Sequence, residues 1–244
     1  MFVRLLKRAF PKLQRAARKV GVHIDYFGRA GNAPDADLYR PLFSPWLSAD
    51  WRAKLRAEDE HSLVSLDRKY VLYQTLSQTI KQCAGSVAEC GVYKGGTAYI
   101  LATILQNEKR RFHLFDTFSG MPETNPDKDV HEKGDFADTS FAGVQRYLAG
   151  FDFVEFHSGF VPESLAAVSA EDFAFVHIDL DIHDAILAAT AFFYSRMPSR
   201  SVLVYDDYGF PSCPGARAAV DTFFADKPEV PFVLPTGQCI VWKI

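Results

Sequence analysis

The sequence predicts an α/β protein with a doubly wound, mostly parallel seven-stranded sheet that ends in an antiparallel C-terminal hairpin. Two observations support this fold class. From about residue 65 onward, short apolar runs rich in β-branched residues alternate with helical stretches, which is the pattern of β-α-β units. Near the C-terminus, two apolar runs flank Thr236-Gly237, a dipeptide typical of a hairpin turn.

Seven segments have the length and the apolar, β-branched character of strands. They are residues 87–92, 111–116, 154–157, 174–178, 201–205, 231–234 and 239–242. The predicted helices lie at residues 66–83, 97–106, 144–148, 162–168, 185–195 and 215–225. Alternation of this kind with a closing antiparallel pair is the arrangement of the class I methyltransferase variant of the doubly wound fold.

Composition divides the chain into an accessory segment, residues 1–60, and a main domain, residues 61–244. Residues 1–20 carry seven Lys or Arg and no acid, with apolar residues at helical spacing. We interpret them as an arm that packs on the domain or on a second subunit of a homodimer or higher homo-oligomer. Contact with a membrane surface and disorder are the alternatives. Residues 28–50, rich in Gly and Pro, are predicted to be a linker or an extended segment.

Composition also argues against several classes of protein. The formal net charge of −3 carries no signature of nucleic-acid binding. No apolar run approaches the roughly 18 residues of a membrane span, and the N-terminus lacks the apolar core of a secretory signal. The four cysteines are scattered, without the spacing of a zinc site or a disulfide framework, which indicates reduced thiols and a cytoplasmic protein.

One long polar stretch, residues 118–139, interrupts the alternation and contains two prolines and many charges. Loops of this length within a compact domain are usually lids or binding loops, or are disordered. We therefore expect this stretch to cover a site, with disorder as the alternative.

The turn after the first predicted strand, Glu89-Cys90-Gly91-Val92-Tyr93-Lys94-Gly95-Gly96-Thr97, has the character of a cofactor site. Glycine allows close approach of the backbone to a ligand, and the next helix offers free N–H groups to an anion. The following strand ends in Asp116, where an acid can bind both ribose hydroxyls of a nucleoside. Tyr93 replaces the second glycine of a dinucleotide motif, and Glu89 would repel a pyrophosphate. These residues favour S-adenosylmethionine, whose ammonium suits Glu89, over NAD(P); a purely structural turn is the alternative.

Two acidic pairs follow neighbouring predicted strands, Asp179 with Asp181 and Asp206 with Asp207. Ligands of an open α/β sheet sit beyond the carboxyl ends of its strands, so the four carboxylates should converge on one pocket. Their mutual repulsion there is costly unless a cation or a proton is bound. Oxygen ligands without cysteine or a histidine pair favour Mg²⁺, with Asp179, Asp206 and Asp207 as the expected ligands. The alternative is that these acids are helix N-caps or solvated loop residues.

A proton acceptor is also expected near this cluster. Asp181 lies two residues beyond an expected ligand and is the first candidate for a general base. His183 is the second candidate, with a surface histidine on the first turn of a helix as the alternative. His177 lies inside an apolar run, which is typical of a hydrogen-bonded core residue.

From roughly residue 66 to the C-terminus, the chain resembles the macrocin O-methyltransferase family, metal-dependent S-adenosylmethionine enzymes of antibiotic-sugar tailoring. The resemblance rests on seven stretches taken together. They are AECGVYKGGT (88–97), HLFDTFSGMPE (113–123), GDF (134–136), SGFVPESL (158–165), HIDLD (177–181), VYDDYG (204–209) and CPGARAAVDTFF (213–224).

The resemblance implies Mg²⁺ at Asp179, Asp206 and Asp207, a base at Asp181, and a hydroxyl of a sugar or glycosylated small molecule as acceptor. The implied cofactor contacts are Glu89, Gly91, Tyr93, Gly95, Asp116, Thr117, Ser158, Gly159 and Asp179. The chain departs from the family pattern at Ile182-His183-Asp184, where Leu-Tyr-Glu is usual, so His183 remains a candidate base. Two other functions stay open: an NAD(P)-dependent oxidoreductase of related topology and a non-catalytic methyltransferase-like binding protein.

Overall fold

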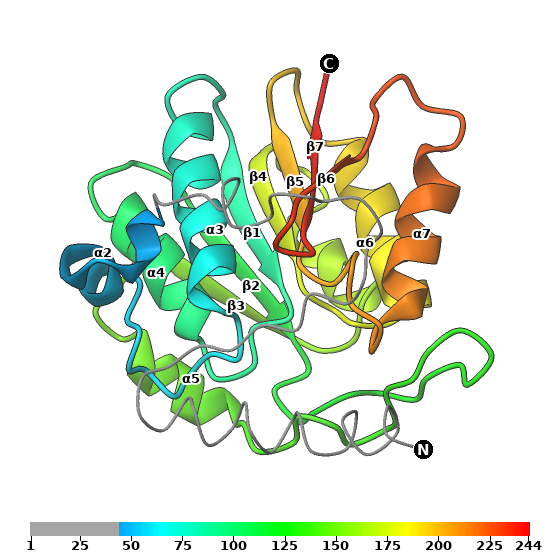
Figure 1. The fold of residues 1–244 in the computed structure, drawn as a ribbon, viewed down its shortest axis with the longest axis horizontal. Helices are drawn as coiled ribbons and strands as arrows, with labels where there is room; N and C mark the ends of the chain where they lie inside the picture. Colours follow the sequence, from blue (N-terminus) through cyan, green and yellow to red (C-terminus); the bar gives the residue numbers. More distant parts are fainter. Residues whose placement is uncertain (1–43) are drawn as a thin grey trace, which may run out of the picture. The chain divides into compact units, whose positions relative to one another are not determined.

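The computed structural model describes residues 44–244. Seven strands form one sheet in the order β3-β2-β1-β4-β5-β7-β6 (Figure 1). They are β1 (Ser86–Cys90), β2 (Phe112–Asp116), β3 (Val154–Ser158), β4 (Phe173–Ile178), β5 (Val202–Tyr205), β6 (Phe232–Val233) and β7 (Cys239–Trp242). The neighbours among β1 to β5 pair in parallel, whereas β7 pairs antiparallel with β5 and with β6. This arrangement confirms the predicted fold class.

Helices cover both faces of the sheet. The α-helices are α2 (Ala49–Lys54), α3 (Leu66–Thr79), α4 (Gly96–Leu105), α5 (Phe141–Tyr147), α6 (His183–Tyr194) and α7 (Pro214–Phe224), and the 3₁₀ helices are η1 (Pro45–Leu47) and η2 (Glu163–Val168). One hydrophobic core joins α3, α4 and α5 to the sheet, and a second joins η2, α6 and α7 to the other face. Strand β5 supplies both cores in alternation, because Leu203 and Tyr205 face one layer and Val202 and Val204 the other.

Local signals in the sequence explain where several helices begin. Ser140 precedes α5, and its side-chain oxygen accepts a hydrogen bond from the Gly143 N–H. Pro214 occupies the first turn of α7, where its missing N–H costs no hydrogen bond. Ser48 caps α2 in the same way as Ser140 caps α5, by accepting from the Trp51 N–H.

The predicted elements are confirmed within a few residues at each end, with one correction. Residues 28–50 are predicted to be a linker or an extended segment; residues 28–43 lie outside the described part, and in the rest Pro45–Leu47 forms η1 and α2 begins at Ala49. The prolines and the short length of these helices hide the pattern, and their stability comes partly from Trp51, which packs edge-on against Tyr70 and Tyr73 of α3. The basic segment 1–20 lies outside the described residues.

The sheet order places a crevice between β1 and β4. From β1 the chain continues to β2 and β3 on one side, whereas β4 and β5 lie on the other side. In doubly wound folds, ligands bind beyond the carboxyl ends of the strands at this reversal. The glycine turn after β1 and the first acidic pair after β4 therefore face the same crevice.

Two further expectations concern the cysteines and the membrane. Cys83, Cys90, Cys213 and Cys239 are buried and none forms a disulfide. Among the helices of residues 44–244, none is long and apolar enough to cross a membrane.

Candidate functional site

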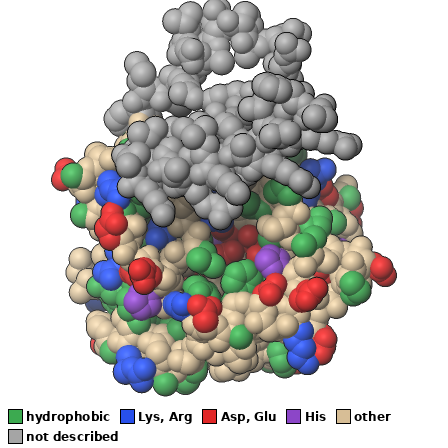
Figure 2. All heavy atoms as spheres, turned by 60° about the horizontal axis from the view of Figure 1, so that its bottom comes forward, with side chains coloured by type: hydrophobic (Ala, Val, Ile, Leu, Met, Phe, Trp, Pro, Cys, Tyr) green, Lys and Arg blue, Asp and Glu red, His purple; other side chains and the backbone are tan. Residues whose placement is uncertain are grey.

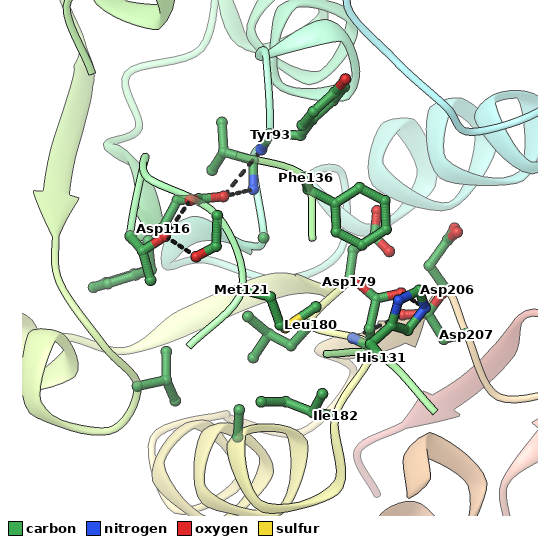
Figure 3. Close-up of a pocket in the computed structure, with 18 of the residues that line it drawn as sticks. Tyr93, Asp116, Met121, His131, Phe136, Asp179, Leu180, Ile182, Asp206 and Asp207 are labelled. Atoms are coloured by element: carbon green, nitrogen blue, oxygen red, sulfur yellow. Dashed lines mark hydrogen bonds and ion pairs between the residues drawn. The ribbon is translucent and has the colours of Figure 1, made fainter. Parts of the chain in front are cut away.

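A cavity of about 590 Å³ opens at the carboxyl ends of β1, β2, β4 and β5, a size typical of a small-molecule site. Figure 2 shows this end of the molecule, where acidic side chains lie recessed among hydrophobic ones. The cavity has two chemically different ends (Figure 3). The glycine-turn end comprises Gly91, Val92, Tyr93, Asp116 and Thr117, and the carboxylate end comprises Asp179, Asp181, Asp206 and Asp207.

Asp116 organises the glycine-turn end through main-chain hydrogen bonds. Its Oδ2 accepts from the Val92 N–H at 2.6 Å and from the Tyr93 N–H at 3.0 Å, and its Oδ1 accepts from the Phe118 N–H at 2.6 Å. The Thr117 hydroxyl also lies 3.5 Å from Oδ1, but it has a shorter bond, 2.6 Å, to the Gly120 carbonyl. A carboxylate offers about four acceptor positions, so the three main-chain bonds leave capacity for a ligand hydroxyl. The carboxylate thus holds the turns after β1 and β2 together and still faces the cavity.

Glycine is required at Gly91 for two reasons. Its φ of +86° lies in the left-handed region, and a Cβ there would stand 1.7 Å from the carbonyl oxygen of Asp179. The turn after β1 therefore touches the backbone at the end of β4, and the two ends of the cavity share this wall. Gly95 also has a positive φ, +90°, immediately before α4.

The structure places the nine expected cofactor residues in three groups. Six of them line the cavity: Gly91, Tyr93, Asp116, Thr117, Gly159 and Asp179. Gly95 and Ser158 lie next to wall residues but are not part of the wall. Glu89 is the third group and needs a correction, because its side chain is fully buried behind the wall.

Glu89 pairs with a core histidine and not with the cavity. Its Oε1 lies 2.9 Å from Nδ1 of His177, and its Oε2 has no hydrogen-bond partner among the described residues. Nε2 of His177 lies 3.6 Å from Oδ1 of Asp206, an ion-pair distance that is too long for a hydrogen bond. Burial alone would lower the pKa of His177, but Asp206 and Glu89 outweigh it and raise this pKa to about 9. His177 is therefore the hydrogen-bonded core residue that the sequence predicts, and it is protonated at neutral pH.

The carboxylate end brings the expected metal ligands together. Single carboxylate oxygens of Asp179, Asp206 and Asp207 lie within 4.8 Å of one another. Burial and then repulsion from the neighbouring acids raise the pKa values of Asp179 and Asp207 well above the usual range. A bound divalent cation would remove this repulsion, and three hard oxygen donors suit Mg²⁺. The residues present therefore fit such an ion.

Asp206 differs from the other two acids because it has cationic partners. The guanidinium of Arg68 on α3 donates to Oδ2, and Nε2 of Gln238 donates to Oδ1 at 2.8 Å. Burial opposes ionisation, but His177, Arg68 and Gln238 outweigh it and hold the pKa of Asp206 below its usual value. Asp206 is consequently ionised. Asp179 and Asp207 lie beside it and lack cationic partners of this kind among the described residues.

Asp181 faces the same end of the cavity from a strained backbone. Its φ is +61°, unusual for a residue with a side chain, and its N–H donates to Oδ2 of Asp207 at 3.2 Å. Its Oδ1 accepts from Sγ of Cys213 at 3.3 Å and lies 3.7 Å from Nε2 of His131. Burial raises the pKa of Asp181, although His131 and Cys213 oppose the shift.

His183 lies outside this cluster, and its role as a base stays a prediction. Its N–H donates to Oδ1 of Asp129, and its Nδ1 lies 2.7 Å from Asp184 and 3.2 Å from Nζ of Lys128. His183 is the first residue of α6, and its contacts with Lys128 and Asp129 hold it against the loop 118–139. It is not part of the cavity wall.

Among the wall residues that the sequence analysis does not single out, three lie close to the expected acids: Arg68, His131 and Cys213. His131 lies in the stretch 118–139, already expected to cover a site, and its four-residue spacing from Asp135 was an available signal. Cys213 begins one of the seven stretches that resemble the family, residues 213–224, but no acid or histidine next to it in sequence indicates a role for it. Arg68 meets Asp206 across 138 residues, a separation for which the sequence offers no signal.

Comparison with known structures agrees with this fold. The O-methyltransferase NovP has a TM-score of 0.68 at 21% identity, over 76% of this chain and 83% of that one. The calicheamicin methyltransferase CalS11 has a TM-score of 0.61 at 18% identity, over 88% and 99% of the two chains. An O-methyltransferase from Bacillus cereus in complex with SAH has a TM-score of 0.51 at 18% identity, over 86% and 95%. At these identities the likeness establishes a shared fold.

Sequence comparison is more specific. No curated protein sequence matches the chain. The family description of Macrocin-O-methyltransferase (TylF) matches residues 47–242, which is most of the chain and includes both ends of the cavity. The chain is therefore a methyltransferase and belongs to the macrocin O-methyltransferase family.

Proposed function

We propose that this protein is a Mg²⁺-dependent O-methyltransferase that moves the methyl group of S-adenosylmethionine to a hydroxyl of a sugar or a glycosylated small molecule. One observation carries the proposal: a single cavity joins the glycine-turn end to the carboxylate end in a member of this family. The neighbours in structure support it, since the B. cereus enzyme is described in complex with SAH and CalS11 as a TDP-rhamnose 3'-O-methyltransferase.

The glycine-turn end would bind the cofactor. Gly91 and Tyr93 bring main-chain atoms to the cavity wall, and Asp116 has acceptor capacity left for ribose hydroxyls. Thr117 and Gly159 border the same end. Glu89 would act indirectly from behind the wall, where its contact with His177 holds the end of β1 against β4 next to Gly91.

The carboxylate end would hold Mg²⁺ through Asp179, Asp206 and Asp207. When bound, the ion would orient the acceptor hydroxyl and lower its pKa. Arg68 and His177 keep Asp206 ionised and oriented whether or not the other two acids are charged. Asp181 would take the hydroxyl proton, because its carboxylate faces this end while its N–H is fixed by Asp207.

With the proton acceptor in place, the reaction requires that the acceptor oxygen be aligned with the methyl carbon. The acceptor oxygen forms a bond to the methyl carbon as the methyl–sulfur bond of S-adenosylmethionine breaks, and the proton passes to the protein. Phe136, Phe160, Leu180 and Phe210 line the cavity and would exclude water from the reacting atoms. Holding the two reactants in this geometry is itself a large part of catalysis.

The proposal is tested first by binding and then by turnover. Calorimetry should show S-adenosylhomocysteine binding, and a screen of diol-bearing sugars that includes TDP-rhamnose should reveal release of S-adenosylhomocysteine. EDTA should abolish turnover, Mg²⁺ should restore it, and Asp181→Asn should lower kcat by at least about 10²-fold with cofactor binding retained. Absence of cofactor binding, or full turnover in excess chelator, would refute the cofactor or the metal assignment respectively.

The wider assignment includes the N-terminal segment and the setting of the enzyme. We propose that the enzyme acts in the cytoplasm as a homodimer or higher homo-oligomer, and that residues 1–60 contribute contacts to the acceptor or to a second subunit. Light scattering of the full chain measures its mass directly, and a monomer would contradict the oligomer.

A further inference from the structure

We propose that His131, oriented by Asp135, is a second catalytic residue that shares the acceptor proton with Asp181. This inference rests on the proposed function and deepens it. In the step, the acceptor O–H bond breaks as the oxygen–methyl bond forms and the methyl–sulfur bond breaks. The proton comes to lie between Oδ1 of Asp181 and Nε2 of His131, and the positive charge of the sulfonium is neutralised.

The orientation of the His131 ring is set within its own loop. Nδ1 of His131 lies 2.9 Å from Oδ2 of Asp135, which also accepts from the Glu132 N–H at 3.2 Å. Ionised carboxylates only accept hydrogen bonds, so Nδ1 carries the hydrogen and Nε2 is left with its lone pair in the neutral ring. A carboxylate behind a catalytic histidine holds the tautomer in the same way in other proton-transferring sites.

The ring of His131 lies at the carboxylate end of the cavity, beside Asp206 and Asp207 (Figure 3). Nε2 lies 3.7 Å from Oδ1 of Asp181 and 3.7 Å from Sγ of Cys213. At 3.7 Å the nitrogen and the oxygen do not form a hydrogen bond, and they must move closer, to about 3 Å, to share one hydrogen. Nε2 of His131, Oδ1 of Asp181 and Sγ of Cys213 come from three different segments of the chain and lie within 3.7 Å of one another.

The neighbouring groups support a proton-accepting role for His131. Burial and the nearby carboxylates raise the pKa of the Cys213 thiol, so this group keeps its hydrogen and can donate it to Asp181 or to Nε2 of His131 but does not act as a base. The carboxylates of Asp135 and Asp181 lie on the two sides of the His131 ring, 2.9 Å from Nδ1 and 3.7 Å from Nε2. The ring also contacts Phe136, another wall residue, with ring centroids 5.3 Å apart.

The acceptor-independent experiment measures the tautomer of His131. Imidazole ¹⁵N shifts of the full chain, labelled at histidine, should show hydrogen on Nδ1 and a lone pair on Nε2, and Asp135→Ala should shift this balance. Asp181→Asn should move the Nε2 signal. The proposal would be overturned if the wild type carried its hydrogen on Nε2, or if neither substitution changed the ¹⁵N shifts of His131. This holds even if no acceptor is found.

The kinetic experiment uses an acceptor identified in the screen described above. His131→Gln should lower the single-turnover rate by about 10²-fold or more, with affinities for S-adenosylhomocysteine and Mg²⁺ within about twofold of wild type. Added imidazole should restore part of the rate of His131→Ala but not of His131→Gln, whose side chain fills the space. The matched variant His183→Gln, at a histidine outside the wall, should stay within about twofold.

The outcomes separate this inference from the proposed function. Turnover by the wild type with undiminished rates in His131→Gln would overturn the role of His131 alone. A rate loss without imidazole rescue, accompanied by a raised acceptor KM, would assign His131 a structural role and overturn the catalytic one. A wild type that transfers no methyl to any acceptor refutes the proposed function, and the tautomer measurement still decides the orientation on which the inference depends.

Discussion

The two ends of the cavity are built by different means. The glycine-turn end is held mainly by main-chain groups: three backbone N–H groups bind the carboxylate of Asp116, and Gly91 admits a backbone contact. The carboxylate end is built from side chains of distant segments, among them Arg68 of α3, His131 of the loop and Gln238 before β7. The glycine-turn end should therefore be sensitive to substitutions that strain its backbone. The carboxylate end should be sensitive to substitutions that change the number of charged side chains in it.

The largest expected effect tests the wall that the two ends share. Gly91→Ala would combine a φ of +86° with a Cβ 1.7 Å from the Asp179 carbonyl oxygen, so backbone must move. We expect the free energy of unfolding to fall by at least about 4 kcal/mol, measured by urea denaturation. Gly150→Ala is the control, since a Cβ there meets nothing within 4 Å. Similar losses in both variants would show that the close contact is unimportant.

The next effect separates two neighbouring acids at the carboxylate end. In EDTA, Asp206→Asn should lower the free energy of unfolding by about 3 kcal/mol, because Arg68 and His177 lose a buried anion. Asp207→Asn should instead raise it by about 1 kcal/mol, because the substitution relieves repulsion from Asp181 and Asp206.

Mg²⁺ should reverse the advantage of Asp207→Asn over the wild type. Ligands that bind only the folded state raise its stability, so the wild type should gain thermal stability with Mg²⁺ while both variants gain little. Thermal unfolding with and without the ion measures this. Equal destabilisation by the two substitutions in EDTA would mean that their charge environments do not differ as described.

A smaller effect is expected at the glycine-turn end. Asp116→Asn places an amide NH₂ against the N–H groups of Val92, Tyr93 and Phe118, or leaves one of them without a charged acceptor. Affinity for S-adenosylhomocysteine should fall by about 1–3 kcal/mol in calorimetry, while stabilisation by Mg²⁺ persists. Loss of the Mg²⁺ effect as well would show that the two ends are not independent.

The last expected effect concerns a side-chain support of the glycine-turn end. Asp59 accepts hydrogen bonds from Tyr147, Arg56 and His61, and the His61 carbonyl accepts from the Gly96 N–H at the start of α4. Burial opposes ionisation of Asp59, but Tyr147, Arg56 and His61 outweigh it and hold its pKa well below the usual range.

A depressed pKa in the folded state stabilises the protein above the unfolded pKa of about 3.9, and this stabilisation is lost as pH falls below it. Asp59→Asn should therefore lower the free energy of unfolding by about 2 kcal/mol at pH 7, and the difference from wild type should shrink below about pH 4. Urea denaturation across this range checks the sign. A difference that grows on acidification would contradict it.

The sequence predicts best what depends on strands and their ends. The apolar runs before Asp116, Asp179 and Asp206 identify strands, and parallel neighbours bring such acids to one edge, so their convergence could be predicted. The roles assigned to these residues remain predictions. Glu89 was expected at the wall, but alternation along β1 does not say that His177 on the next strand would take its carboxylate.

Contacts across the chain could not be predicted. His131 meets Asp181 through an irregular loop, and no periodicity connects them. Arg68 lies on a helix whose pattern predicts only that it packs on the sheet, and its contact with Asp206 depends on the tertiary arrangement. The carboxylate end was therefore predicted as a set of acids without the cations and the histidine that complete it.

The contact between Gly91 and the Asp179 carbonyl has a consequence for how such enzymes diversify. It joins the backbone of the glycine-turn end directly to the backbone of the carboxylate end, so neither of these two segments can move far without the other. Much of the rest of the wall comes from segments outside the strands, including His61 to Val64, Phe136 and Phe210. Substitutions in these segments would change the shape of the cavity while the backbone contact between its two ends stays in place.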